Sequence, residues 1–484
     1  MAEASSSNSG FSISEQPQVQ DQNLTGEMSV SSLVLTVLAF SAPMVVVSGY
    51  MPLAISTAGT GAPFAFILTT IVLFIFAVGY LAITKYLTKT GNFCAYITAG
   101  LGKKIGLGSA FISVFSYVAL MGGVYLFIGM TFTEIFTYFF NLQTQWWVWS
   151  CLAWVVVTGI CHLNIEFSAK FMTLVMILEV LFIMVFNGSI LFSTERTPLT
   201  LDPLLPTSLL DGNVILPLLF CIMVYIGLES TTVYRDEVKN PNQSIPKATY
   251  LSILLIGLLY TVTCYFVIAV YGDKSYEVAV NSPTGMFTDA LALYTGEVAV
   301  KIKYALVVTS LIAALVSVNN VASRYLFALG RRGTLPTALG KVHPKHGSPY
   351  MASFATQGLM ILIVGLFLMS ISNLETAYAS MAGAGTFGII ALMFLVSLST
   401  VIWFIRHPDV KENIFKAKVL PAISTAIFGY MTIKIFMSME LVIGCEKADA
   451  WIYQLLISAI FIAGVVLASY YQVCKQKIYQ YVGD

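Results

Sequence analysis

The sequence predicts an all-α membrane protein with about twelve transmembrane helices, organised as two inverted repeats of five. Hydrophobic residues make up 57% of the 484-residue chain and charged residues only 10%, against roughly 25% charged residues in a typical soluble domain. The chain holds about twelve apolar runs, each near the ~20 residues that one membrane-crossing helix needs. Two of these runs, five apart in the chain, are interrupted in the middle by glycine, as inverted repeats require.

The apolar runs are separated by short polar connections that leave no room for a sizeable soluble domain. We expect helices, with ends uncertain by several residues, at about 31–57, 63–85, 107–140, 146–162, 169–192, 214–234, 246–271, 299–329, 350–371, 376–405, 418–440 and 450–472.

Two tails flank a membrane domain expected at 29–475. Residues 1–28 are rich in Ser, Gln and Glu and contain no Lys or Arg, so they lack the positive start of a secretory signal. We expect them to form a disordered cytoplasmic tail and residues 476–484 to form a second cytoplasmic tail. The seven cysteines are scattered without CxxC spacing, and we expect no disulfide framework, metal site or cofactor.

Basic residues in the connections predict the orientation. Most of them fall on one side of the predicted membrane, and that side is the cytoplasm by the positive-inside rule. Those on the other side are Arg196, Lys274, Lys301, Lys303 and Lys447. Both termini are therefore expected to be cytoplasmic in a multi-pass protein of the plasma membrane. The basic loops are topology signals and do not indicate a nucleic-acid surface.

The first apolar run contains an interruption around Gly49. Pro43 precedes Ser48-Gly49, and Pro52 follows. Because Pro52 has no N–H to donate, we expect unwound backbone from Ser48 to Met51 and a new half-helix near Pro52. A simple proline kink is the alternative.

The sixth apolar run is interrupted at Tyr225-Ile226-Gly227-Leu228-Glu229. Gly227 is a weak helix former and a permitted break point in lipid if the released backbone groups face protein or a wet cavity. Glu229 is costly at membrane depth, so it is expected to face an interior site. Corresponding breaks at Gly49 and Gly227 fit two inverted repeats, about 31–192 and 214–405, with a binding site between them. A tolerated kink with a hydrogen-bonded Glu229 is the alternative.

Three motifs identify a family resemblance. GLES followed by DEVKNPNQSIPKA, then SRYLFALGRRGTLP, then HPKHGSP resemble the amino acid–polyamine–organocation superfamily, its amino-acid permeases in particular. The resemblance implies two inverted five-helix repeats plus two extra helices at about 418–472, with substrate between helices one, three, six and eight. It matches Ser48, Gly49 and Tyr50 to the unwound part of helix one. Many members read Gly-Ser-Gly where this chain has Val47-Ser48-Gly49.

The unwound segments offer backbone groups to a zwitterionic amino acid. Amides at the start of a half-helix attract anions, and carbonyls at the end of one attract cations. We expect the amides of Gly49, Tyr50 and Met51 to bind a substrate carboxylate. The carbonyls expected to bind its ammonium are those of Val46, Val47, Tyr225 and Ile226. Glycine at 49 and 227 would let the ligand approach the backbone.

Side chains near these segments suggest a lid and a coupling site. Tyr225 could cover the ammonium with its ring; packing between helices is the alternative. Glu179 lies midway along 169–192, where resembling permeases often carry a lysine thought to replace a coupling sodium. Burial disfavours an ionised carboxylate, so proton coupling through Glu179, or through Glu229, is the first hypothesis. A sodium ion held by Glu179 with Ser310 or Ser317, and a static hydrogen-bonded acid, are the alternatives.

These features favour a secondary transporter of amino acids or related small amines. No GxxxxGK[ST] sequence supports ATP drive, and no HExxH or GxSxG sequence supports an integral-membrane enzyme. The expected pocket offers no acid to a cationic side chain apart from Glu179 and Glu229, which favours neutral amino acids. An amine or polyamine permease, an exchanger, and a non-transporting sensor on the same fold remain alternatives. The expected partners are the solute, a proton before sodium, and membrane lipid.

Overall fold

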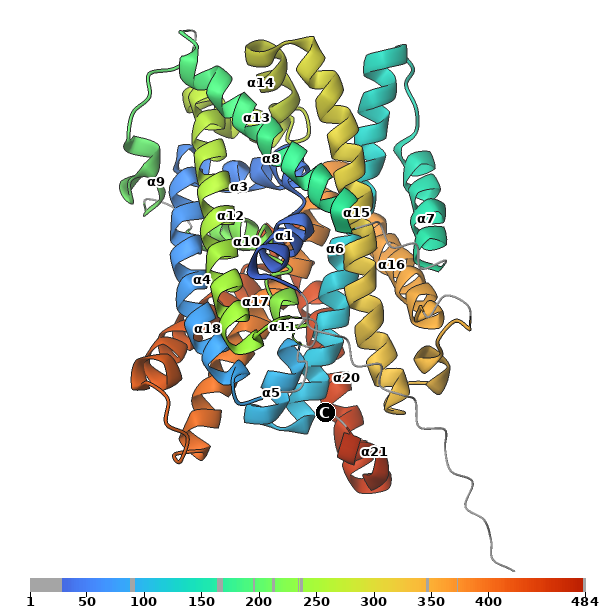
Figure 1. The fold of residues 1–484 in the computed structure, drawn as a ribbon. Helices are drawn as coiled ribbons and strands as arrows, with labels where there is room; N and C mark the ends of the chain where they lie inside the picture. Colours follow the sequence, from blue (N-terminus) through green and yellow to red (C-terminus); the bar gives the residue numbers. More distant parts are fainter. Residues whose placement is uncertain are drawn as a thin grey trace, which may run out of the picture.

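The chain folds into a bundle of long helices (Figure 1). The computed structural model describes residues 28–87, 92–162, 169–194, 196–210, 214–233, 235, 238–344, 348–371 and 373–481. Within these ranges the elements are helices and no strand forms. The predicted all-α fold is therefore confirmed. The tail predicted at 1–28 lies outside the described residues, apart from Met28.

The first half of the bundle contains the first interrupted helix and four further long helices. Its elements are α1 (Val30–Ser41), α2 (Pro43–Val45), the π-helix η1 (Val46–Tyr50), α3 (Met51–Ala58), η2 (Gly59–Gly61), α4 (Ala62–Thr84), α5 (Phe93–Leu101), α6 (Lys103–Phe140), α7 (Trp146–His162), α8 (Ala169–Phe192), η3 (Asp202–Leu204) and α9 (Thr207–Leu210).

The second half begins with another interrupted helix. Its elements are α10 (Ile215–Met223), α11 (Ser230–Val233), α12 (Pro241–Tyr271), η5 (Gly272–Lys274), α13 (Ser275–Asn281), α14 (Met286–Thr295), α15 (Glu297–Arg331), η6 (Thr337–Gly340), α16 (Tyr350–Ser370), α17 (Leu374–Arg406), the π-helix η7 (Phe415–Val419), α18 (Leu420–Met437), α19 (Met439–Ile443), α20 (Ala450–Cys474) and α21 (Gln476–Tyr481).

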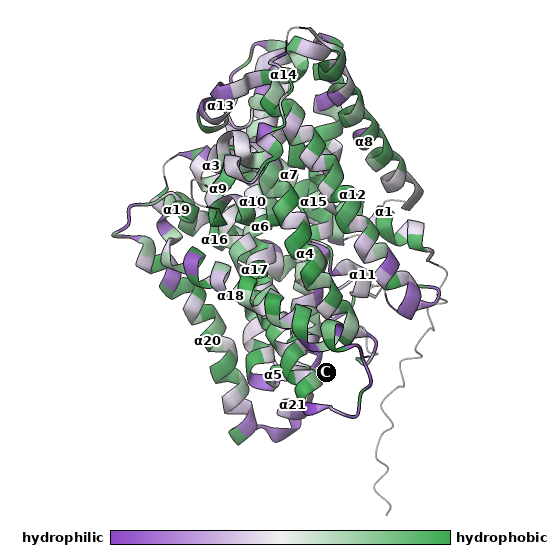
Figure 2. Ribbon diagram, turned by 90° about the vertical axis from the view of Figure 1, so that its left-hand side faces the viewer, coloured by the Kyte–Doolittle hydropathy of each residue, from purple (hydrophilic) through white to green (hydrophobic). Residues whose placement is uncertain are grey.

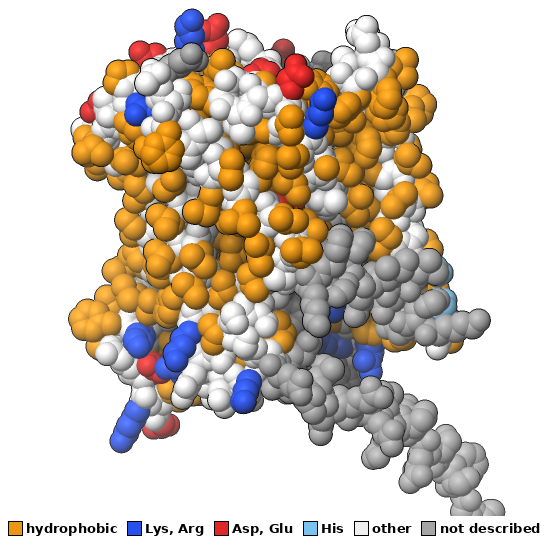
Figure 3. Space-filling model, turned by 45° about the horizontal axis from the view of Figure 1, so that its top comes forward, with side chains coloured by type: hydrophobic (Ala, Val, Ile, Leu, Met, Phe, Trp, Pro, Cys, Tyr) orange, Lys and Arg blue, Asp and Glu red, His pale blue; other side chains and the backbone are white. Residues whose placement is uncertain are grey.

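The surface of the bundle is suited to a membrane. Hydrophobic side chains cover its middle and charged side chains gather towards its two ends (Figure 3), and hydrophilic residues concentrate in connections and helix ends (Figure 2). Nine helical segments among the described residues are long and apolar enough to cross a membrane. The count of twelve membrane-spanning helices stays a prediction. Residues Val30–Thr84, which contain two of the predicted helices, count as one of the nine segments, and α7 has only 17 residues.

The long helix α6 forms the centre of the bundle with α17 beside it. In the most apolar 18-residue stretch of α6, 94% is buried inside the protein. The corresponding share in α20, at the periphery, is 22%. Small residues let α17 approach α6 closely: a Cβ on Gly385 would lie 2.7 Å from Leu120 Cγ and 2.8 Å from the Ser116 carbonyl oxygen. This packing fixes the side chains of both helices around the first interrupted helix.

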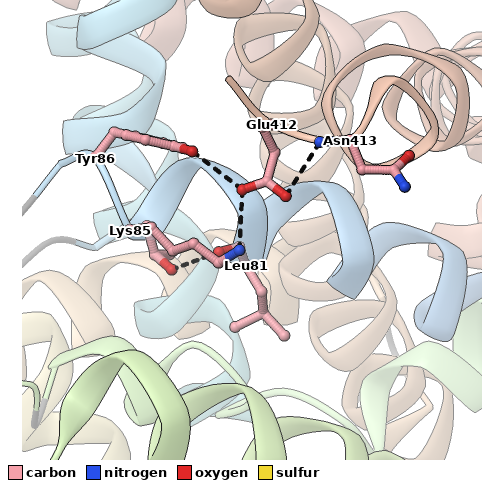
Figure 4. A network of polar contacts seen from close by, with 6 residues as sticks. Leu81, Lys85, Tyr86, Glu412 and Asn413 are labelled. Carbon is pink, nitrogen blue, oxygen red and sulfur yellow. Dashed lines mark hydrogen bonds and ion pairs between the residues drawn. The ribbon is translucent and has the colours of Figure 1, made fainter. Parts of the chain in front are cut away.

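A polar network ties the end of α4 to the loop after α17, at the end of the bundle that holds the C-terminus (Figures 1 and 4). Lys85 Nζ lies 2.9 Å from Glu412 Oε2, and the Tyr86 hydroxyl donates to the same oxygen over 3.1 Å. Burial acts to raise the pKa of Glu412, but these hydrogen bonds and one from the Asn413 amide hold it below its ordinary value.

A second set of contacts closes the same end. The buried Arg235 guanidinium donates to the Thr84 carbonyl oxygen at 3.1 Å and to Asn242 Oδ1 at 2.7 Å. The Lys239 amide donates to the Met28 carbonyl oxygen at 3.1 Å. The segment after α11 is thereby held against both α4 and the residues that precede α1.

Candidate functional site

The first interrupted helix breaks at Ala42. This residue has φ 49° and ψ 74°, a left-handed conformation that separates α1 from α2. The right-handed helical conformation is disfavoured before proline, and Pro43 follows directly. From Pro43 to Ala58 the backbone is continuously wound through α2, η1 and α3. The break thus lies seven residues, about two helical turns, before Gly49, around which the sequence predicts it.

The unwound backbone expected from Ser48 to Met51 is wrong for this structure. The chain there forms a π turn in which the Met51 amide donates to the Val46 carbonyl oxygen. Pro52 cannot donate to the Ser48 carbonyl, and the wider turn adjusts the hydrogen-bond pattern without opening the helix. Two groups predicted to contact substrate, the Met51 amide and the Val46 carbonyl, therefore satisfy each other.

The second interrupted helix breaks where the sequence places it. Residues 224–229 form turns between α10 and α11, and Gly227 has φ +101°. A Cβ on Gly227 would lie 2.2 Å from Cδ1 of Phe40 on α1. Glycine is required here both by the positive φ and by this close approach, which is made by a side chain of α1.

Ser41 joins the two breaks directly. Its hydroxyl, at the end of α1, donates to the Val224 carbonyl oxygen at 3.1 Å, and it lies 2.7 Å from the Tyr260 hydroxyl on α12. The predicted pairing of two interrupted helices is therefore present, but it runs through Ser41 and Val224 rather than through Gly49 and Gly227.

Glu179 is on α8, and its side chain lies beside the start of the second half of the first helix. Its Oε2 accepts a hydrogen bond from the Met44 amide at 3.1 Å and another from Ser310 Oγ on α15 at 3.1 Å. The side chain is 2% exposed. A carboxylate at a helix N-terminus is stabilised by the helix dipole and by the unpaired amides there. The structure brings Glu179 and Ser310 together, whereas Ser317 lies two turns, about 10 Å, further along α15.

Glu229 has one satisfied and one unsatisfied carboxylate oxygen. Oε2 accepts a hydrogen bond from the Gly227 amide at 3.2 Å. Oε1 is buried without a hydrogen-bond partner in the described part of the chain, and so is Oγ of the adjacent Ser230. Buried polar atoms without a partner are rare, so these two mark a place where a further polar group would be stabilised.

Tyr225 points towards α4 and α12. Its hydroxyl lies 2.7 Å from Thr70 Oγ1 on α4, and a Cβ on Gly257 of α12 would lie 2.9 Å from the same hydroxyl. The ring therefore packs between helices in this structure. This is the alternative to the predicted lid over the substrate.

An aromatic stack covers Gly49. Tyr378 of α17 stacks on Tyr50 with ring centroids 6.1 Å apart and on Phe127 of α6 with centroids 5.3 Å apart. A Cβ on Gly49 would lie 2.7 Å from the Tyr378 hydroxyl. That hydroxyl and Ser48 Oγ are buried and have no hydrogen-bond partner among the described residues. Sequence reasoning missed Tyr378 and Phe127, because nothing distinguishes them from the many other aromatic residues of the chain.

A wide cavity lies beyond this stack. One of the helices that line it, α14, lies at the end of the bundle opposite the C-terminus (Figure 1). We call this cavity the outer vestibule: its volume is about 980 Å³ and its lining comes from α6, α7, α14, α15 and α17. The lining includes Met130, one turn from Phe127, and Leu374, one turn from Tyr378. The predicted substrate-binding residues do not line it. The aromatic stack thus separates the outer vestibule from Gly49.

Acidic residues line the outer vestibule, and one of them lies beside a buried lysine. The acids are Glu134, Asp289, Glu297 and Glu375. Lys303 is 1% exposed, donates to Thr288 Oγ1 at 2.8 Å and lies 3.8 Å from Glu134 Oε1. Burial and the charge of Glu134 raise the pKa of the Asp289 carboxyl, against the opposing effect of Lys303. These contacts link α6, α14 and α15.

An all-α membrane fold with two interrupted helices joined beside buried acids is the architecture of membrane transporters. A family model described as "Amino acid permease" matches residues 29–466. The chain belongs to this family, in agreement with the predicted resemblance.

Individual relatives are distant. The chain is 23% identical over 269 residues to the branched-chain amino acid permease BcaP of Bacillus subtilis, covering 56% of this chain and 54% of that one. It is 23% identical over 398 residues to the lysine-specific permease of Saccharomyces cerevisiae, covering 72% and 64%. It is 27% identical over 153 residues to the gamma-aminobutyric acid permease of Escherichia coli, covering 32% of each. The matches thus span between about a third and two thirds of these relatives.

Proposed function

We propose that this chain is a secondary active transporter, not an enzyme, that moves neutral amino acids across the plasma membrane by alternating access, coupled to protons. Its membership of the amino acid permease family supports the class of solute. The observation that carries the coupling is the contact of Glu179 with Met44 and Ser310, because it links a titratable group to the break in the first helix.

Protonation of Glu179 would loosen this link. An ionised carboxylate only accepts hydrogen bonds, and here it accepts them from the amide that starts a half-helix and from a hydroxyl on α15. A proton removes the charge that the helix N-terminus stabilises and weakens both bonds. The half-helix that begins at Pro43 is then freer to move relative to α8 and α15. Proton binding and access to the site are coupled in this way.

Substrate would bind between the π turn and the second break once the first helix opens. Opening of the π turn releases the Met51 amide and the Val46 carbonyl, which pair with each other in the closed form. The amides of Gly49, Tyr50 and Met51 would then bind the carboxylate. The ammonium would be bound by the carbonyls of Val46, Val47, Tyr225 and Ile226. The free Oε1 of Glu229 is a further acceptor for the ammonium or for a second proton.

We favour neutral substrates because both buried acids, Glu179 and Glu229, already accept hydrogen bonds from the protein. Glu179 accepts two hydrogen bonds and Glu229 one, so neither is dedicated to a cationic side chain. The acidic lining of the outer vestibule favours the alternative of an amine or polyamine substrate, because such a lining concentrates cations. The names of the relatives include both branched-chain and lysine permeases and support either class.

Sodium coupling is the weaker candidate. A sodium ion needs several oxygen ligands, and Glu179 Oε2 already accepts an N–H and an O–H. Ser317, the other predicted ligand, is two turns from Ser310. Measurements of solute flux distinguish the proposed transporter from an exchanger and from a non-transporting sensor on the same fold. The orientation with both termini in the cytoplasm rests on the distribution of basic residues.

Uptake by the purified full chain in liposomes tests this proposal. A thermal-shift screen against neutral and cationic amino acids and against amines first selects the solute, because a ligand that binds the native state raises its apparent stability. We expect a neutral amino acid to be accumulated under an inward pH gradient without sodium, and a protonophore to abolish that accumulation. Strict dependence on sodium would rule out proton coupling, and binding without flux would indicate a sensor.

A further inference from the structure

A second cavity lies between the start of α10 and the end of α18. Its volume is about 470 Å³, and its lining includes Val214, Leu216, Tyr430, Lys434, Ser438 and Leu441. We call it the Lys434 groove. It shares no lining residue with the outer vestibule.

Lys434 provides the charge in this groove. It lies in the last turn of α18, within the apolar segment Phe415–Met437. No described carboxylate lies within 4 Å of its ammonium, which is 5.8 Å from the centroid of the Tyr430 ring. A lysine in a membrane-spanning segment is costly unless it is paired or reaches the interface. Among the described residues, the groove therefore presents a cation without a counter-ion.

The surroundings of Lys434 are apolar and outward-facing. Tyr430 is 57% exposed, Ile433 57% and Met437 66%, all on the same helix, and Leu441 of α19 is 53% exposed. This surface belongs to the part of the bundle that faces lipid. A ligand with an anionic end at Lys434 and long apolar chains would cover both parts of the site.

Two further groups favour an anion. The first turn of α10 borders the groove, and a helix N-terminus carries a partial positive charge. The hydroxyl of Ser438, also in the lining, can donate to an oxygen.

We propose that the Lys434 groove binds the headgroup of an anionic phospholipid, with its acyl chains along the exposed face of α18. A zwitterionic phospholipid brings its own cation to the headgroup, whereas an anionic one leaves its negative charge to Lys434, so the site selects the anionic class. The lipid also contacts the start of α10, which runs straight into the break at 224–229. Its occupancy therefore braces the half-helix ahead of that break.

Native mass spectrometry of the detergent-solubilised full chain tests the proposal. The protein is titrated with phosphatidylglycerol or with phosphatidylcholine of identical acyl chains. We expect severalfold higher occupancy by phosphatidylglycerol in the wild type, a fall to the phosphatidylcholine level in Lys434→Gln, and retention in Lys434→Arg. The exposed Lys447→Gln, on the loop after α19, is the matched control with the same loss of charge. It should bind as the wild type does.

Two results would overturn the proposal. One is equal occupancy by the two lipids in the wild type, and the other is unchanged phosphatidylglycerol binding in Lys434→Gln. Glycerol 3-phosphate added in excess should not displace the lipid, because it lacks acyl chains; displacement would mean a site for soluble phosphates instead. Since the readout is lipid binding, it is independent of whether the chain transports amino acids.

Discussion

The amide of Met44 donates a hydrogen bond to Oε2 of Glu179 over 3.1 Å, so that a carboxylate on α8 caps the second half of the interrupted first helix. The same oxygen accepts a hydrogen bond from Ser310 of α15. Three helices thus meet at one buried acid, directly after the backbone break at Ala42.

Replacing Gly227 by alanine should destabilise the protein and abolish transport. The position has φ +101°, and a Cβ there would lie 2.2 Å from the Phe40 ring. The left-handed conformation alone costs an alanine about 1–2 kcal/mol, and the overlap with Phe40 adds to this. Thermal unfolding in detergent measures the loss. Gly358→Ala on α16 is the control, since a Cβ there meets nothing within 4 Å. Equal unfolding temperatures for the two variants would contradict the argument.

Tyr378→Phe should keep or raise stability while weakening substrate binding. The Tyr378 hydroxyl is buried without a described partner, and a buried hydroxyl left unbonded costs about 1–3 kcal/mol. Its place beside Gly49 makes a solute its expected partner. Tyr125→Phe is the matched variant, because the Tyr125 hydroxyl bonds Gln357 at 3.3 Å. Thermal unfolding and the apparent KM are measured for both. A fall in stability for Tyr378→Phe without a rise in KM would make the residue purely structural.

The network at Glu412 should stabilise the protein at neutral pH and stop doing so in acid. Its pKa is lowered in the folded state from the usual 4.5, so the stabilisation is full above about 4.5 and disappears as pH falls through the folded value. Because Lys85 is partly exposed, the effect is about 0–1 kcal/mol. The unfolding temperatures of wild type and Glu412→Gln should differ at pH 7 and converge in acid. A difference that grows in acid would refute the assigned direction.

Glu134→Gln should cost more stability than Glu297→Gln. Glu134 lies 3.8 Å from the buried Lys303 ammonium, and removing the partner of a buried charge can cost up to about 3–5 kcal/mol. Partial exposure of Glu134, at 30%, reduces this figure. Glu297 lines the same outer vestibule and forms no ion pair with Lys303 in the structure. Denaturation of both variants at low and high salt provides the comparison; equal losses would mean that the ion pair is inconsequential.

Sequence reasoning located the helices and one of the two breaks because hydropathy and Gly227 carry that information locally. It missed the break at Ala42, since alanine is the best helix former and the cause lies in the following proline. It selected Glu179 because an acid in an apolar run stands out. It could not name Met44, because the contact uses a backbone amide that every residue type except proline possesses. Tyr378 and Phe127 were missed for a related reason: their role comes from tertiary stacking on Tyr50, which has no local signature.

The most direct test of the account is the current that substrate evokes in proteoliposomes adsorbed to a solid support. A neutral amino acid carried with a proton moves one positive charge, so the wild type should give an inward current that grows with the pH gradient. Glu179→Gln can still accept hydrogen bonds from Met44 and Ser310 but cannot exchange a proton there. It should retain the thermal shift with substrate and give no current, while the exposed Glu277→Gln on α13 behaves as the wild type. A normal current from Glu179→Gln would contradict the assignment of proton coupling to this residue.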